Sequence, residues 1–472
     1  MSFSPELPVR LWQAGVPLAA LGVGVMAGVD PARAALLAVA LAAVFVVLNE
    51  LLAGVCLFAF FAFLDYYYPN VVTLFGLLLA MSWLAAVTAG RLRGREFLST
   101  HPAATALVAL VPAWAAMSLL WAEASPPVTT AVVKYGVNGA LFLILYTAVR
   151  TRRHVLLVLA AFVASAAYSA AAGLLVPAES AAGGDSDRIA GSIGDPNALA
   201  RLLVAALVIA TVLAALKDLS HPKRLLAGAS AALCAAVLLL TYSRGGLVAL
   251  ACALAAAFVF AGRWRAQVGV LAVAIALVGG GTYLAVASPE ERERLTEADG
   301  GSGRTDLWRV GWQIVQDQPV LGVGAGNFGE VSRRYLGEAG LLRRGDLIFS
   351  TANVPHNTYL GTWVELGLVG LVLLLAVLVF SLSCLVRAAR VSMRAGDVGM
   401  ELLARGLFVA LVGMLAADFF ISEPYNKHLW LLLALGPAVL AVVRSREPAE
   451  STRMPPPLRP LVRGRTSNPG VV

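Results

Sequence analysis

The chain has 472 residues, of which 59% are hydrophobic and only 14% are charged. Its mean hydropathy of +0.79 excludes a soluble multidomain protein and indicates an integral membrane protein. The formal net charge of +8 at pH 7 does not indicate a nucleic-acid partner, because the excess of basic residues lies in short loops and in the C-terminal tail.

Apolar segments of spanning length follow one another along the chain. A spanning helix needs about 20 mostly apolar residues, whereas barrel strands are about 10 residues long and alternate in polarity. The segments are rich in Ala, Leu, Val and Gly, so we predict an all-α polytopic transmembrane bundle of 12 to 14 spans. The candidate spans are 11–29, 33–48, 51–65, 71–90, 103–121, 129–149, 155–176, 197–216, 225–241, 246–261, 267–287, 358–386, 401–420 and 427–443.

The first three candidate spans show two further features. Segment 11–29 lacks a clear cleavage site, so we interpret it as a retained helix and not as a signal peptide. Asn49 and Glu50 separate the second and third segments, which leaves a broken or re-entrant helix open at that point.

Basic residues in the short loops predict the orientation. They gather in every second loop, and such loops face the cytoplasm. Both termini are then cytoplasmic, and the remaining loops are extracytoplasmic. The basic loop residues are Arg91, Arg93, Arg95, Arg150, Arg152, Arg153, Lys217, Lys223, Arg224, Arg263, Arg265, Arg387, Arg390 and Arg394.

We divide the chain into four parts. They are an N-terminal transmembrane bundle at 1–287, an extracytoplasmic loop at 288–357, C-terminal transmembrane helices at 358–446 and a disordered cytoplasmic tail at 447–472. The loop is long enough to be translocated regardless of its charge.

The loop contains one clear helical pattern. Apolar residues recur at helical spacing from Leu307 to Val315 and the pattern stops at Pro319, which predicts an amphipathic helix on the outer membrane interface. Gly322, Gly324 and Gly326 then resemble a phosphate-binding loop, but no βαβ unit surrounds them, so we expect a flexible turn.

Two arginines lie at expected helix starts on the outer side. Arg188 precedes Asp195 and Pro196, which have the identities of an N-cap and a first helical residue, and Asn197 beside them is a supporting candidate. Backbone N–H groups at a helix N-terminus favour an anion. Arg244 lies between two apolar runs, where a guanidinium is usually paired or functional. The alternatives are an interfacial arginine at Arg188 and a snorkelling arginine at Arg244.

The outer loop adds two further candidates. Arg304 heads the amphipathic segment, and His356 lies at the mouth of the next span, whose expected N-cap is Asn357. A histidine there can act as a general base near neutral pH, although a lone histidine is more often structural. Glu365 lies inside the same span and is expected to face the bundle, because a carboxylate is costly in a membrane.

These motifs resemble those of the O-antigen ligase and polymerase superfamily of bacterial envelope proteins. The resemblance is carried by RIAGSIGDPNALA, SRGGLV, GSGRTDLWRVGWQIVQDQPVLGVGAGNF and PHNTYLGTWVELGLVGL, within residues 188–372. It implies a polytopic inverting glycosyltransferase that needs no metal or cofactor and acts at the outer face of the cytoplasmic membrane. By the same resemblance, Arg188, Arg244 and Arg304 would bind the donor diphosphate and His356 would be the essential histidine.

The resemblance also implies the substrates. The donor would be a glycan on undecaprenyl diphosphate, and the acceptor a lipid A core sugar, another lipid-linked glycan or a protein side chain. Membrane lipids and other polysaccharide assembly proteins are further expected partners, and nucleic acid is not. A competing class is a transporter or flippase for an anionic or lipid-linked substrate, which Glu365 and Asp418 within spans keep open.

Overall fold

The computed structural model describes residues 20–21, 23–64, 66, 69–90, 92, 97–175, 188–286, 303–336 and 354–446. Within these residues the regular structure is entirely helical and no strand occurs, which confirms the all-α prediction. The predicted tail 447–472 lies outside the described residues, as does a large part of the predicted loop 288–357.

The helices follow the predicted apolar segments closely. The first group is α2 (Pro31–Asn49), α3 (Leu51–Phe61), α4 (Pro69–Thr88), α5 (Phe97–Thr100), α6 (Pro102–Met117), α7 (Ser125–Ala148), α8 (Arg152–Leu175), α9 (Pro196–Ala215), α10 (His221–Leu240), α11 (Arg244–Phe260) and α12 (Arg265–Val286). The second group is α14 (Arg304–Asp317), α15 (Phe328–Val331), α17 (Thr358–Arg394), α18 (Val398–Ala417) and α19 (Lys427–Arg444).

Nine helices of the described chain are long and apolar enough to cross a membrane. The number rises to ten if α11 and the start of α12, which meet at 115°, count as one broken span. The chain is therefore a multi-pass membrane protein, but the predicted total of 12 to 14 spans is not confirmed. The possible break at Asn49 and Glu50 is present, because α2 ends at Asn49 and Glu50 has extended backbone angles before α3.

The core of the bundle lies around α9, α18 and α19, which are the most buried of the candidate spans. Small residues allow these helices to approach closely. Gly413 of α18 lies against Val204 of α9, and Gly436 of α19 lies against the backbone of Ser381 in α17. The packing between helices thus depends on positions where a larger side chain would not fit.

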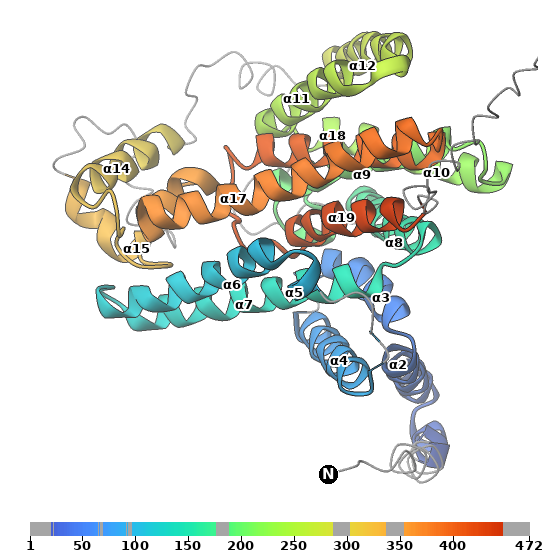
Figure 1. The fold of residues 1–472 in the computed structure, drawn as a ribbon, viewed down its shortest axis with the longest axis horizontal. Coiled ribbons are helices and arrows are strands. Elements are labelled where there is room, and N and C mark those ends of the chain that lie inside the picture. The colour runs from blue at the N-terminus through green and yellow to red at the C-terminus, as the bar shows by residue number, and fades with distance from the viewer. Residues whose placement is uncertain are drawn as a thin grey trace, which may run out of the picture.

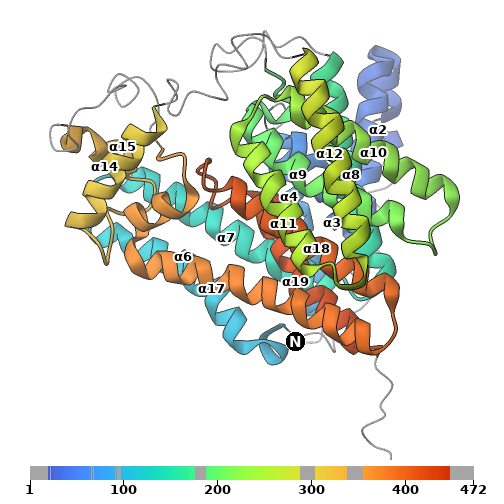
Figure 2. The same ribbon diagram turned by 90° about the horizontal axis from the view of Figure 1, so that it is seen from above.

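The helices α14 and α15 lie at one end of the molecule, beside the first part of α17 (Figures 1 and 2). The predicted amphipathic helix is confirmed as α14, and it ends before Pro319. Its apolar residues pack against Val364 and Leu360 of α17. The part of this face that packs on α17 is covered by protein and not by lipid. The place of α14 at the outer membrane interface stays a prediction.

The helix α17 is broken at Gly367, although the sequence predicts one continuous span. Gly367 has φ 66° and ψ −171°, a backbone region that only glycine adopts readily. The 37 residues of α17 would make about 55 Å of straight helix, which exceeds the ~30 Å thickness of a bilayer core. The break separates a short segment, Thr358–Leu366, from the longer part that follows.

The backbone groups freed by this break are hydrogen-bonded elsewhere, as a membrane environment requires. The carbonyl groups of Val364 and Glu365 accept hydrogen bonds from the N–H groups of Val323 and Gly324, at 2.9 and 2.8 Å. The carbonyl of Leu366 accepts one from the indole N–H of Trp114 at 2.8 Å. The turn that we expected to be flexible is thus fixed against the broken helix.

Candidate active site

Arg188 and Ser243, the residue before Arg244, both bind the side-chain amide of Asn197. The Oδ1 atom of Asn197 accepts hydrogen bonds from Nη2 of Arg188 at 3.1 Å and from Oγ of Ser243 at 2.8 Å. Nε of Arg188 also donates to the carbonyl of Thr241 at 2.9 Å. Asn197, predicted as a supporting residue, therefore joins the start of α9 to the loop between α10 and α11.

Side-chain caps fix the starts of α9, α11 and α17 at this end of the bundle. Asp195 accepts hydrogen bonds from the N–H groups of Asn197 and Ala198, and Pro196 is the first residue of α9, as predicted. Asn357 caps α17 in the same way, which confirms the predicted start of that helix. Ser243 caps α11, whose first residue is Arg244. The N-termini of α9, α11 and α17 thus supply backbone N–H groups close to the arginines.

The glycines after Arg244 serve helix packing. A Cβ atom on Gly246 would lie 2.7 Å from Ala200 of α9, and one on Gly245 would lie 3.0 Å from Phe420. The sequence suggested close approach by the backbone or by a ligand, and the structure shows close approach by other helices and loops. This packing fixes the first turn of α11.

The helix α14 brings Arg304 to the same place. Its Trp308 donates a hydrogen bond from the indole N–H to the carbonyl of Pro355 at 2.9 Å, and Pro355 directly precedes His356. Burial lowers the pKa of Arg304, Asp195 raises it, and Arg188 and Arg244 lower it further. The mutual influence of these charges places all three predicted arginines in one electrostatic neighbourhood.

His356 belongs to this neighbourhood as well. Burial and the charge of Arg304 lower its pKa, while Asp195 raises it. The imidazole is therefore neutral at pH 7 and can accept a proton. Its backbone is left-handed, with φ 49°, which costs about 1–3 kcal/mol for a residue other than glycine.

Left-handed residues other than glycine occur at only two positions in the described part of the chain. They are Tyr242 and His356, and each directly precedes the N-cap of a helix in this cluster. Such strain persists only when the surrounding structure holds it, and it tends to gather at functional sites. The two strained turns therefore lie directly before the N-caps of α11 and α17, where Arg244 and His356 are located.

Glu365 has a different position from the other predicted residues. Its Oε2 atom accepts a hydrogen bond from the N–H of Gly326 at 2.8 Å. It therefore supports the turn that contacts the break in α17, as a carboxylate facing the protein interior. It influences neither Arg304 nor His356 to a resolved extent.

Two residues near the site were not identified from the sequence. Asp195 was interpreted only as an N-cap, but its charge also acts on Arg304 and His356. Arg201 was not singled out, although it is fully buried in α9. A single arginine within the apolar run ALARLLVAALVIA is the signal that could have identified it, because a charge inside a span is costly.

An apolar cavity of the described chain lies apart from this cluster. The described residues contain no group of three or more His, Cys, Asp or Glu side chains placed to hold a metal ion. An apolar cavity of about 1040 Å³ lies between α9, α10, α11, α12 and α18, and none of the predicted site residues lines it. The cluster brings together guanidinium groups, helix N-termini, the Asp195 carboxylate and the imidazole of His356.

Part of the chain is similar to a known protein family. Residues 229–375 match the family model described as O-antigen ligase. The match confirms the resemblance to the O-antigen ligase superfamily. The range that matches the O-antigen ligase model contains Arg244, Arg304 and His356, and Arg188 lies before it. No curated protein matches the chain. Together with the apolar helices, the O-antigen ligase match supports a membrane enzyme that transfers glycans.

Proposed function

We propose that the chain transfers a glycan from undecaprenyl diphosphate to an acceptor hydroxyl at the outer face of the bacterial cytoplasmic membrane. In this proposal both termini are cytoplasmic and the reaction inverts the anomeric carbon. The observation that carries it is the meeting of Arg188, Arg244, Arg304 and His356 at one end of the bundle, although they come from separate parts of the chain.

The arginines would bind the diphosphate of the donor. A guanidinium group offers a planar fork that matches two phosphate oxygens and remains charged. As the bond between the anomeric carbon and the diphosphate oxygen breaks, negative charge grows on the leaving group, and preorganised cations stabilise it. Arg188 is preorganised by Asn197 and by the carbonyl of Thr241, and these groups supply the charge that the step needs without a metal.

His356 would act as the general base. The neutral imidazole takes the proton of the acceptor hydroxyl as its oxygen attacks the anomeric carbon from the face opposite the diphosphate. One C–O bond forms, one C–O bond breaks, and undecaprenyl diphosphate leaves with the electron pair. The lowered pKa of His356 keeps the base form available at neutral pH.

The same step can attach one glycan to an acceptor or extend a polymer. A lipid A core acceptor would give a ligase, a second lipid-linked glycan a polymerase, and a protein side chain an oligosaccharyltransferase. The length and the anchor of the product distinguish these three reactions.

A transporter or flippase is the second candidate function. Asp418 and Glu365 are the residues that favour it, because a transporter could use carboxylates inside the membrane as binding charges. In the structure Asp418 forms an ion pair with Arg201 at 3.1 Å, and Glu365 binds the N–H of Gly326. Both carboxylates therefore have partners within the protein, which favours the transferase.

The proposal is tested with purified protein in nanodiscs, supplied with an undecaprenyl-diphosphate-linked glycan and an acceptor. Release of undecaprenyl diphosphate, an inverted product and activity in EDTA are expected. His356→Ala should abolish release, whereas His221→Ala, which alters an exposed histidine at the start of α10, should not. Movement of the intact donor across a bilayer without release would favour the flippase, and full activity of His356→Ala would remove the histidine from the mechanism.

A further inference from the structure

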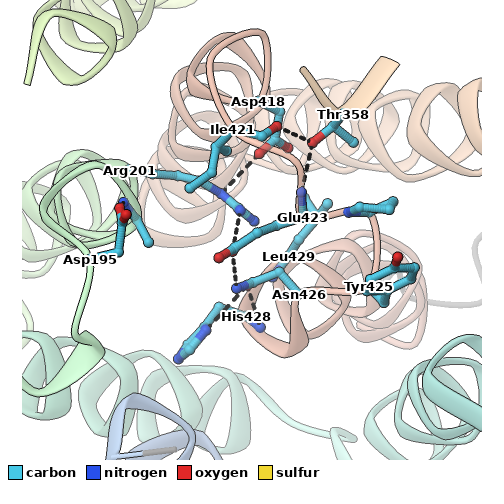
Figure 3. A network of polar contacts seen from close by, with 12 residues as sticks. Asp195, Arg201, Thr358, Asp418, Ile421, Glu423, Tyr425, Asn426, His428 and Leu429 are labelled. Carbon is cyan, nitrogen blue, oxygen red and sulfur yellow. Dashed lines mark hydrogen bonds and ion pairs between the residues drawn. The ribbon is translucent and has the colours of Figure 1, made fainter. Parts of the chain in front are cut away.

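A buried charge network lies between α9 and the loop that joins α18 to α19 (Figure 3). Arg201 of α9 is fully buried; its Nε atom lies 3.1 Å from Oδ1 of Asp418, and its Nη1 donates to Oε2 of Glu423 at 2.8 Å. Asn426 also donates to Oε2 of Glu423, at 2.6 Å. One guanidinium group thus holds both ends of the loop 418–423.

The same loop holds the start of α17. The N–H of Thr358 donates to the carbonyl of Asp418 at 2.8 Å, and the hydroxyl of Thr358 donates to the carbonyl of Ile421 at 2.7 Å. The N–H of Glu423 donates back to that hydroxyl at 3.1 Å. Asn357 donates its N–H to Oγ of Ser422 at 3.1 Å. His356 directly precedes Asn357 in the chain, so its position depends on this loop.

Arg201 also lies on the helix that positions the donor arginine. Asn197, which binds Arg188, is four residues before Arg201 and therefore about one turn away along α9. A rigid helix thus connects the group that holds Arg188 to the group that holds the loop before α17. The distance between the diphosphate cluster and His356 is set through α9.

The network is poorly suited to a purely stabilising role. Nη2 of Arg201 and both carboxylate oxygens of Asp418 have no hydrogen-bond partner in the described part of the chain. A buried ion pair recovers its desolvation cost only when its remaining polar atoms are satisfied. Packed apolar side chains would serve stability at least as well, so the geometry that the pair imposes is its distinctive property.

We propose that Arg201 is a positioning residue of the transferase, which fixes the loop 418–423 and thereby holds His356 at a set position beside the donor arginines. This inference rests on the proposed function. Arg201 itself touches neither the reacting atoms nor the donor in this scheme, because it is fully buried within the bundle. Its loss should reduce the rate of the chemical step more than the affinity for the donor.

The test uses three variants of the full-length protein in nanodiscs. Arg201→Met removes the charge, Arg201→Lys keeps the charge but lacks the planar fork, and Asp418→Asn keeps the shape of the carboxylate. We expect Arg201→Met to lower kcat by about 10-fold or more with the KM for the donor changed by less than about 3-fold, and Arg201→Lys to recover part of kcat. Hydrogen exchange at the amides of residues 357–362 and 419–423 should become faster in Arg201→Met.

The matched control is Arg405→Met. Arg405 pairs with Glu401 at 3.0 Å in the first turns of α18, at the opposite end of that helix from Asp418. Arg405→Met also removes an arginine from an ion pair, and Arg405 is half-buried. Because this pair lies far from the loop 418–423, the change should leave kcat and exchange at residues 357–362 unaltered.

The outcomes separate this inference from the proposed function. If the wild type releases no undecaprenyl diphosphate but Arg201→Met accelerates exchange at 357–362, the transferase proposal fails, and only the structural part of this inference, that Arg201 fixes the loop 418–423 and the start of α17, is supported. If the wild type is active and Arg201→Met keeps its kcat or its amide protection, the positioning role is overturned. A rise in donor KM at unchanged kcat also overturns it, because Arg201 would then act in binding. If Arg201→Met fails to fold, the same measurements on Arg201→Lys and Asp418→Asn decide whether Arg201 has the positioning role.

Discussion

The side-chain oxygen of Asn197 lies 3.1 Å from Nη2 of Arg188 and accepts a hydrogen bond from it. The same atom accepts a second hydrogen bond at 2.8 Å, from the hydroxyl of Ser243, which is the N-cap of α11. One amide oxygen therefore fixes the relative position of Arg188 and of the turn that carries Arg244. Hydrogen bonds to charged groups are stronger than neutral ones, so this oxygen is a sensitive point of the site.

Replacing Asn197 by Ala should free Arg188 and leave the Ser243 hydroxyl without this acceptor. We expect kcat/KM for the donor to fall by about 10-fold, which corresponds to about 1.4 kcal/mol. Initial rates over a range of donor concentrations measure it. Asn49→Ala, which removes an exposed amide bonded to the carbonyl of Phe45, is the control and should behave as the wild type. An unchanged kcat/KM in Asn197→Ala would show that Arg188 does not depend on Asn197.

The pH dependence should report the charges around His356. Its pKa is lowered by burial and by Arg304, so the acid limb of kcat/KM should lie below pH ~6.5, the value for an unperturbed histidine. Removing the cation in Arg304→Gln should raise this pKa and move the limb to higher pH. Asp195→Asn removes the charge that raises the pKa and should move the limb to lower pH, while asparagine still caps α9.

The position of the limb is the quantity to measure in both variants, since their maximal rates will also change. Shifts in opposite directions are expected from the signs of the two charges. A limb that stays in place in both variants would mean that a group other than His356 titrates in the reaction.

Arg244 should be difficult to replace. Arg244→Ala is expected to lower kcat/KM by about 100-fold or more, as for the loss of one preorganised group that stabilises a developing negative charge. Arg244→Lys should retain more activity than Arg244→Ala, because the ammonium keeps the charge but cannot bind two phosphate oxygens in a plane. Arg394→Ala, at the exposed end of α17, serves as the control. Equal activity of Arg244→Lys and the wild type would argue against bidentate phosphate binding.

The break in α17 predicts a strong requirement for glycine. In Gly367→Ala the new Cβ atom would clash with the carbonyl of Val320, in a backbone conformation that alanine avoids. We expect a loss of at least about 2 kcal/mol in the free energy of unfolding. Thermal unfolding in detergent measures it, with Gly280→Ala as the control. No atom lies within 4 Å of a Cβ at Gly280, within α12, so that change should be neutral or stabilising by up to ~1 kcal/mol.

Much of the fold could be predicted because it depends on local pattern. The lengths of apolar runs predicted α4 and most later helices, and the caps Asp195 and Asn357 predicted where α9 and α17 begin. The break at Gly367 could not be predicted, because it depends on the docking of the distant turn at 322–326. The protein-covered face of α14 was missed for the same reason, since a hydrophobic pattern does not distinguish lipid from another helix as its partner.

The sequence by itself determined that this is an all-α membrane protein, and residue types with local spacing identified Arg188, Arg244, Arg304 and His356 as candidates. Only the tertiary structure decided that Asn197 joins two of the loops and that Arg201 connects α9 to the start of α17. The physical reason is that a hydrogen bond or an ion pair depends on distances between atoms remote in the chain. Such distances are fixed by helix packing, which leaves no local pattern in the sequence.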